Sequence, residues 1–264
     1  MREGTRKTLF VITSLVFAFL YIPILVLIVF SLNDSKIGTV WTGLTFDWYA
    51  RLFSNSQIID AALNSLFVAV ITTIISTVLG TLAALALHRY GFPGKRTVGF
   101  VFYIPIVIPD IVLAVALLVL YSFLDIKFSL ATVIPGHVVF GISFVILVLL
   151  ARLAGLDKAM EESAEDLGAN KWHTFWKVTF PLIYPGILAG ALLAFTISLD
   201  EFVVAFFTTG PGSNTLPVLV YSMVRRGVSP EINALSTILI LSVTLVIAIV
   251  GWRMNKKNKQ EKGF

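Results

Sequence analysis

The strongest constraint on this chain is a series of long apolar runs. A helix that crosses a bilayer needs about 20 consecutive, mostly apolar residues. Six segments meet this requirement: residues 9–32, 61–87, 98–123, 130–150, 186–207 and 232–252. Of the 264 residues, 57% are apolar and 13% are charged, whereas soluble domains carry roughly 25% charged residues. The sequence therefore predicts an all-α membrane protein with six transmembrane helices in a lipid bilayer.

Basic residues are distributed unevenly among the segments that connect these predicted spans. The N-terminus, the connections 88–97 and 151–185 and the C-terminal tail together hold 15 of the 20 lysines and arginines. Such residues are enriched in short cytoplasmic loops, so we expect both termini in the cytoplasm. Three regions follow: residues 1–60 with the first transmembrane helix and an extracytoplasmic loop, residues 61–252 with five further helices, and a cytoplasmic tail at 253–264.

The composition excludes several classes of function. The net charge is +5, but the basic residues flank apolar spans and set orientation in the membrane, so we expect no nucleic-acid binding. The chain has no cysteine, which excludes disulfides and thiolate chemistry. The three histidines lie far apart, and no Ser–His–Asp arrangement or metal-ligand spacing is present. We therefore predict no catalytic residue and no metal site.

A charged insert separates the fourth and fifth apolar runs. Asp157 can cap a helix over residues 158–167, and Gly168 supplies the left-handed turn that ends it. Asn170 can cap a second helix, which we expect to end before Pro181 because the residue ahead of a proline leaves the α conformation. The sequence therefore predicts a helix–glycine–helix element on the cytoplasmic side.

The first helix of this insert is amphipathic. Its apolar residues Met160, Ala164 and Leu167 share one face. The carboxylates on the opposite face are Glu161, Glu162, Glu165 and Asp166. The helix can therefore lie on the membrane surface and present negative charge to the cytosol. The residues alone leave two interpretations open: an ordinary interfacial helix, or a contact surface for a soluble partner.

The spacing within the insert resembles the EAA loop of ABC importer permeases, EAA-x3-G-x9-I-x-L-P. The matching positions are Glu162, Ser163, Ala164, Gly168, Val178, Phe180 and Pro181. Three of them depart from the motif: Ser163 replaces Ala, Val178 replaces Ile and Phe180 replaces Leu. In that family the loop is the coupling helix that docks into a groove of the ATP-binding subunit. The resemblance implies this coupling role for Glu162, Ser163, Ala164, Gly168 and Pro181.

Two later segments, SLDEFVVAFFTTGP at 198–211 and LPVLVYSMVRRGVSPEINALSTI at 216–238, resemble the spermidine/putrescine (PotC-type) family of ABC importer permeases. Weaker similarity extends over nearly the whole chain. The resemblance implies a type I ABC importer permease fold with a cytoplasmic coupling helix, in a bacterial inner (plasma) membrane. It also implies the partners: a homodimer of ATP-binding subunits, a second, PotB-like permease subunit, and an extracytoplasmic polyamine-binding protein.

The chain carries no phosphate-binding loop of the form G-x-x-x-x-G-K-[ST]. The only Gly-Lys pair in a turn, at residues 94–95, has Arg89 where the first glycine of that motif should stand. We therefore expect that the chain is not an enzyme and holds no cofactor. ATP and Mg are expected on the partner ATPase.

Three carboxylates fall inside the predicted spans: Asp110, Asp200 and Glu201. A carboxylate at the centre of a spanning helix costs about 2.5–3.5 kcal/mol, so it normally faces the bundle interior, a partner or an aqueous path. A polyamine carries several ammonium groups that need fixed acceptors when they lose water. We expect these acids to serve a cation path, with Asp200 lining it and Glu201 as its neighbour or as a contact to the second permease subunit.

Each of these sites has a structural alternative. Asp110 follows Pro105 and Pro109, which interrupt the third span, so it can instead cap a half-helix that restarts at Ile111. Aromatic residues such as Tyr103 are candidate cation–π partners, although most aromatic residues in spans are structural.

Three further polar features also have both a functional and a structural interpretation. Tyr121 is a second candidate cation–π partner. His137 is expected to be a buried, hydrogen-bonded histidine rather than a proton carrier. The connection 33–60, with Trp48, fits either the outer membrane interface or a delivery protein.

Other functional classes remain open at this level. A proton-driven secondary transporter also uses intramembrane acids, but it has no use for an EAA-like insert. A channel-forming or assembly protein would use the acids for helix packing. Within ABC importers, permeases for another small solute or ion, such as sulfate or molybdate, share the loop, and the acids argue against an anion.

Overall fold

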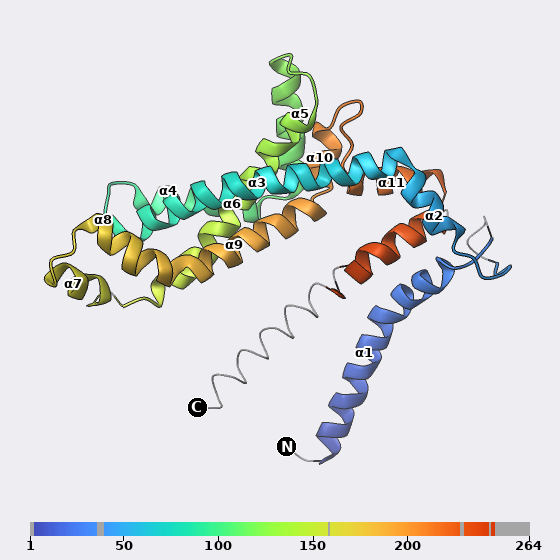
Figure 1. Cartoon of the computed structure of the whole chain (residues 1–264), viewed down its shortest axis with the longest axis horizontal. Helices are drawn as coiled ribbons and strands as arrows, with labels where there is room; N and C mark the ends of the chain where they lie inside the picture. The colour runs from blue at the N-terminus through green and yellow to red at the C-terminus, as the bar shows by residue number, and fades with distance from the viewer. Residues whose placement is uncertain (1–2, 36–39, 158, 228–229, 243, 246–264) are drawn as a thin grey trace. The chain divides into compact units, whose positions relative to one another are not determined.

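The structure is a computed structural model that describes residues 3–35, 40–157, 159–227, 230–242 and 244–245 (Figure 1). These residues are almost entirely helical, and an isolated β-bridge joins Asn33 to Leu44. The chain divides into two compact units. One unit comprises residues 1–59 and 220–264, and the other comprises residues 60–219.

The first unit opens with a long, exposed helix and an ordered connection. Helix α1 (Glu3–Phe30) has no buried residue in its most apolar stretch. Beyond it, Trp48 of α2 (Asp47–Ser54) donates its indole N–H to the carbonyl of Asn33 at 2.7 Å, and the Trp48 side chain is buried. The described part of the connection predicted at 33–60 therefore packs around Trp48, and its role at the outer interface or with a delivery protein stays open.

The second unit holds most of the remaining helices. They are α3 (Ser56–Arg89), α4 (Lys95–Val107), α5 (Asp110–Phe123), α6 (Leu130–Ala154), α7 (Ala159–Asp166), α8 (Lys171–Thr174), the π-helix η1 (Phe175–Thr179), α9 (Phe180–Asp200), α10 (Val203–Thr208) and α11 (Leu216–Arg226). The first residues of α3 and the last residues of α11 belong to the first unit. In Figure 1, α3, α6 and α9 run alongside one another, and α5 points away from them.

Helix α6 packs closely between α3 and α9 because small residues line both contacts. A Cβ added to Gly141 of α6 would lie 2.3 Å from the hydroxyl oxygen of Ser76 in α3, and one added to Gly80 of α3 would lie 2.7 Å from Val145. On the other side, a Cβ added to Gly190 of α9 would lie 3.4 Å from the Cα atom of Val145. Small residues let helix backbones approach closely in membrane proteins. Among the described membrane-length helices, α6 is the most buried.

The described helices account for most of the predicted spans. Four are long and apolar enough to cross a membrane: Arg6–Phe30, Ser56–Arg89, Leu130–Ala154 and Lys171–Asp200. The pair α4 and α5 makes a fifth if it is counted as one bent span. The sixth predicted span, 232–252, lies partly outside the described residues, within which Pro230–Ser242 forms a shorter apolar helix. The all-α class is confirmed, and the count of six stays a prediction.

Close packing between α3 and α6 predicts that Gly141→Ala destabilises the protein. Alanine favours a helix over glycine by up to about 1 kcal/mol, but here its Cβ collides with Ser76, and overpacking costs about 1–3 kcal/mol. We expect a lower thermal unfolding midpoint in detergent. Gly99→Ala is the matched control, because a Cβ at Gly99 of α4 meets nothing within 4 Å. Equal midpoints for the two variants would contradict this account of the α3–α6 contact.

Candidate functional site: an acidic cluster and a helical insert

The predicted third span is broken near its middle, and Asp110 stands at the break. Helix α4 ends at Val107, Ile108 is extended, and α5 begins at Asp110 at an angle of 100° to α4. A residue that precedes proline is pushed out of the α conformation, which explains why Ile108 leaves the helix ahead of Pro109. Pro105 lies inside α4 without ending it, so only one of the two prolines marks the break.

A second break separates α9 from α10 and corrects the continuous span predicted at 186–207. Helix α9 ends at Asp200, Glu201 is extended, and α10 begins at Val203. The Oε1 atom of Glu201 accepts a hydrogen bond from the amide of Val204 at 3.0 Å. In a continuous helix that amide would bond the carbonyl of Asp200. The Glu201 side chain takes over this role, so the break needs neither proline nor glycine.

The two breaks lie close together, which gathers the three acids predicted for the path. Glu201 is near enough to Asp110 and Asp200 for the charges to interact. Asp110 and Asp200 are exposed, and Glu201 is half-buried. None of the described lysines or arginines forms an ion pair with these three acids. Asp110 is the first residue of α5, and Pro109 precedes it at the N-cap position, so the alternative role of Asp110 at the start of a half-helix stays open.

Packing between helices holds this arrangement in place. Ala114 of α5, Phe140 of α6 and Val204 of α10 form one buried apolar cluster. Helices α6 and α9 are also joined by a hydrogen bond of 2.9 Å between Nδ1 of His137 and the hydroxyl of Ser198, both buried. His137 is therefore buried and hydrogen-bonded, as predicted. The acids stand at the edge of a packed core rather than on a flexible loop.

The aromatic residues considered for cation contact differ in exposure. Tyr121 is buried and meets Phe128 edge-on, with 6.4 Å between ring centroids. Tyr103 of α4 is exposed. Tyr121 therefore serves the core, and Tyr103 alone of the two predicted tyrosines is accessible. Among the described residues, no three histidine or carboxylate side chains converge as metal ligands would.

The helical insert between α6 and α9 has the predicted caps. The Asp157 side chain accepts a hydrogen bond of 3.0 Å from the amide two residues on, where α7 begins. The Asn170 side chain accepts one of 2.9 Å from the amide three residues on, in α8. Between them Gly168 has φ +90°, and this left-handed turn brings the amide of Ala169 to 3.0 Å from the carbonyl of Ala164. The helix–glycine–helix arrangement is confirmed with α7 at Ala159–Asp166, and its cytoplasmic location stays a prediction.

The second helix of the insert, however, does not end before Pro181. Helix α8 continues through η1 into α9, so that Lys171–Asp200 forms one membrane-length helix. In η1 the amide of Phe180 bonds the carbonyl of Phe175, five residues earlier. This wider turn accommodates a proline that an unbroken α-helix would reject. The insert is therefore mechanically continuous with the fifth span.

The residues that resemble the EAA motif lie on the outer surface of the insert. Glu162, Ser163, Gly168 and Pro181 are exposed, and Ala164 is half-buried. Large apolar side chains beside them are unusually exposed, with Leu167 at 89% and Trp172 at 68%. Exposed apolar groups within a polar rim mark interaction surfaces. The insert thus has the composition of a docking surface.

One acidic side chain of the insert turns away from the predicted surface. Glu161 of α7 forms an ion pair with Arg89, the last residue of α3, and accepts a hydrogen bond of 2.5 Å from the hydroxyl of Thr179 in η1. Arg89 also donates to the Thr179 oxygen at 2.9 Å. Glu161 therefore has a partner within the described chain, and the prediction that the carboxylates face the cytosol stays a prediction. No local pattern marks this pair, because 72 residues separate its members.

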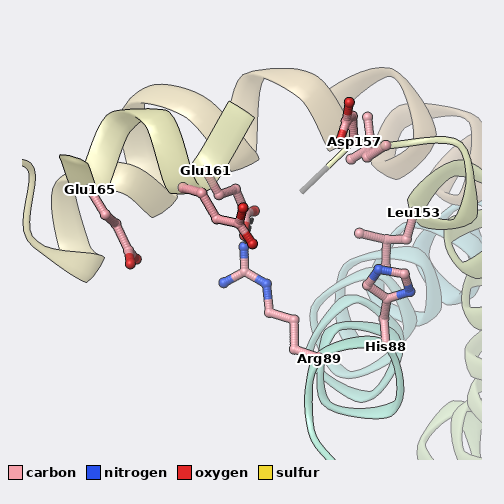
Figure 2. Close-up of a pocket in the computed structure, with 8 residues that line it drawn as sticks. His88, Arg89, Leu153, Asp157, Glu161 and Glu165 are labelled. Atoms are coloured by element: carbon pink, nitrogen blue, oxygen red, sulfur yellow. Dashed lines mark hydrogen bonds and ion pairs between the residues drawn. The ribbon is translucent and has the colours of Figure 1, made fainter. Parts of the chain in front are cut away.

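A pocket of about 220 Å³ lies beside this ion pair (Figure 2). Its lining residues are His88, Arg89, Leu153, Leu156, Asp157, Glu161, Glu162 and Glu165. Figure 2 shows the Arg89 side chain reaching from the end of α3 toward Glu161, with Glu165 farther along α7. Helix α7 itself packs against α8 and η1. Arg89 therefore bridges an open space between α3 and the insert.

The sequence of this chain matches one protein-family model and is similar to several transport permeases. The family model described as "Binding-protein-dependent transport system inner membrane component" matches residues 76–255. The chain is 44% identical over 234 residues to the spermidine/putrescine transport system permease protein PotC of Escherichia coli strain K12, covering 88% of this chain and 89% of that protein. It is 41% identical over 257 residues to the putrescine transport system permease protein PotI of the same strain, covering 95% and 92%.

A solved structure shares the fold. It is a chain of a bacterial ABC transporter involved in the import of the acidic polysaccharide alginate, with a TM-score of 0.77 and 20% sequence identity, and the match covers 97% of this chain and 96% of that chain. At this identity the likeness concerns the fold alone. It agrees with the ABC importer permease fold that the sequence implied.

The turn at Gly168 predicts a specific effect of substitution. No atom lies within 4 Å of a Cβ added there, but φ is +90°, and a Cβ in a left-handed turn costs about 1–2 kcal/mol. Gly168→Val should therefore speed amide hydrogen exchange over residues 164–169 roughly tenfold, as measured by mass spectrometry. Gly168→Asn is the control, since Asn tolerates this conformation. Similar exchange in the two variants would contradict a role for the left-handed turn.

Proposed function

The chain belongs to the family of binding-protein-dependent transport system inner membrane components, and on that premise we propose that it is the transmembrane permease subunit of an ATP-driven polyamine importer. PotC and PotI, to which it is similar over nearly its whole length, are permeases of spermidine/putrescine and putrescine transport systems. The observation that carries the proposal is the cluster of Asp110, Asp200 and Glu201 at two helix breaks.

The charge of the cluster suits a polycation. A carboxylate is expensive inside a membrane unless it meets a partner or water, and none of the described basic residues pairs with these three. A polyamine supplies the missing charge as several ammonium groups spaced along one chain. Each ammonium needs acceptors when it leaves bulk water. Asp110 and Asp200, both exposed, are positioned to provide them.

The helix end beside Asp200 adds to this attraction. The last carbonyl groups of a helix lack intrahelical partners and carry partial negative charge. Helix α9 ends at Asp200, so its terminal carbonyls and the Asp200 carboxylate present negative charge at the same place. Broken helices form cation sites of this kind in other transporters. Glu201 holds the break open through its bond to Val204, so we assign it a positioning role in addition to its charge.

The fold by itself does not select the substrate. The alginate importer, which has the same fold, is involved in the import of an acidic polysaccharide, so charge preference must reside in particular side chains. In this chain those side chains are three acids. The second candidate is an ABC permease for another small solute, and it is favoured only if the acids prove dispensable.

The partners follow from the insert and from the family. We propose that the exposed surface of the insert, with Glu162, Leu167 and Trp172, docks on a homodimer of ATP-binding subunits that holds ATP and Mg, while this chain holds no cofactor. A second, PotB-like permease subunit would complete the path. An extracytoplasmic binding protein would deliver the polyamine. The exposed apolar side chains of Leu167 and Trp172 in the insert support docking of a partner.

The acidic cluster predicts that charge removal lowers polyamine uptake. Asp200→Asn keeps the side-chain volume but removes the charge, and hydrogen bonds to charged groups are strong enough to change an equilibrium about tenfold. We expect spermidine uptake into vesicles containing the full importer to fall about tenfold in Asp200→Asn and further when Asp110→Asn is added. Undiminished uptake in the double variant would overturn the cation path.

One control variant and two variants of Glu201 sharpen this test. Asp125→Asn removes a negative charge from an exposed loop, and its φ of 54° suits Asn, so uptake should stay at the parent level. Glu201→Gln keeps an oxygen that can accept from Val204, whereas Glu201→Leu does not. We expect a folded importer with reduced uptake for Glu201→Gln and poor assembly for Glu201→Leu.

The unequal distribution of basic residues predicts the orientation of the chain. Cysteines can be introduced singly because the chain has none. In whole cells, a membrane-impermeant thiol reagent should label Lys127→Cys on the outside and leave Tyr90→Cys unlabelled until the cells are opened; both positions are exposed. The reverse pattern would show that the termini lie outside the cytoplasm.

A further inference from the structure

Helix α7 of the insert is connected to the membrane-length helices by two sets of contacts. Helix α7 packs against α8 and η1, which lead directly into α9. The ion pair of Glu161 with Arg89 is a separate connection, because it reaches the end of α3 across the open pocket (Figure 2). The insert is thus joined to two membrane-length helices by two different routes.

We propose that the Arg89–Glu161–Thr179 cluster is the positioning contact through which movement of the insert reaches α3 and α9 together. This inference rests on the proposed function, since it assigns a role within an ATP-driven importer. The three residues are not part of the EAA-like motif. Arg89 and Thr179 lie outside its matching positions, and Glu161 precedes the first matching position. None of the three needs to touch either the ATPase or the polyamine.

The geometry fits a contact that transmits motion. The cluster is closed: Thr179 donates to Glu161 at 2.5 Å and accepts from Arg89 at 2.9 Å, while Arg89 and Glu161 pair directly. Each member comes from a different element. Thr179 is 1% exposed, so it cannot turn to water if Glu161 moves. A shift of α7 therefore either carries the other two residues with it or leaves a buried hydroxyl without its partners.

The location of Thr179 strengthens the assignment. It closes η1, the π-helix between the insert and α9. Single π-turns in long helices are marginally stable and are frequent at functional sites. The hydrogen bond that Thr179 donates to Glu161 therefore ties α7 to the least regular point of the fifth span. The same carboxylate acts on α3 through Arg89.

The cluster contributes little to the free energy of unfolding compared with the packing of α6 against α3 and α9. Arg89 and Glu161 side chains are 31% and 33% exposed, and ion pairs at such sites add little to folding. The core contact of α6 with α3 and α9 remains intact without the cluster. Variants of the cluster should therefore still assemble, and their defect should appear in coupling rather than in folding.

The test uses the complete importer reconstituted in vesicles, with spermidine uptake and ATP hydrolysis measured in the same sample. In Arg89→Gln we expect the amount of spermidine transported per ATP hydrolysed to fall about tenfold, with unchanged yield of the complex. Thr179→Val keeps a similar shape and removes the hydroxyl, and it should lower the same ratio. Arg96→Gln, in α4, removes a nearby exposed arginine that takes no part in the cluster and should leave the ratio at the parent value.

A charge exchange separates positioning from a merely structural role. The double variant Arg89→Glu, Glu161→Arg restores the ion pair with its members reversed, so it should recover a substantial part of the ratio that each single variant loses. The inference is overturned if Arg89→Gln and Thr179→Val keep the parent ratio. It is also overturned if uptake and hydrolysis fall in parallel with the yield of the complex.

The wild-type complex distinguishes failure of this inference from failure of the proposed function. If the wild-type complex hydrolyses ATP but takes up no spermidine or putrescine, the proposed substrate is wrong. If it transports polyamine and the cluster variants transport it with the parent ratio, only the inference about the cluster fails.

Discussion

A helix in a bilayer must satisfy its own backbone, because no water is available to replace a lost hydrogen bond. The two breaks in this chain meet that requirement in different ways. At the first, the amide of Ile108 still bonds the carbonyl of Ile104, and Pro109 has no amide to satisfy. At the second, the Glu201 side chain bonds the amide of Val204. Both solutions place a carboxylate beside an interrupted helix, so the acidic cluster follows from how the breaks are accommodated.

Packing between the other helices holds the two breaks in place. Glycines on α3, α6 and α9 let the three helices approach closely, and the apolar cluster of Ala114, Phe140 and Val204 joins α5 and α10 to α6. The insert is held by weaker means: two side-chain caps, each contributing about 1 kcal/mol, a left-handed glycine and the cluster at Arg89. A rigid core beside a lightly held insert suits a protein in which the insert responds to a soluble partner.

Family and fold leave the choice of substrate to a few side chains. The match to PotC and PotI extends over most of the chain, whereas the alginate importer shares only the fold. A common framework can therefore serve substrates of opposite charge. We propose that in this chain the three acids at the helix breaks set the preference for a cation.

The sequence by itself determined the membrane class, most of the spans, the caps of the insert and the left-handed turn at Gly168, because apolar run length, capping residues and glycine conformation are local properties. Pro109 also indicated the first break from the sequence. The sequence did not reveal the second break, since Glu201 replaces a backbone partner without any proline or glycine to mark it. It also missed the π-turn ahead of Pro181. Only the tertiary structure brought Asp110 near Glu201 and Arg89 to Glu161, because such contacts depend on how distant helices pack.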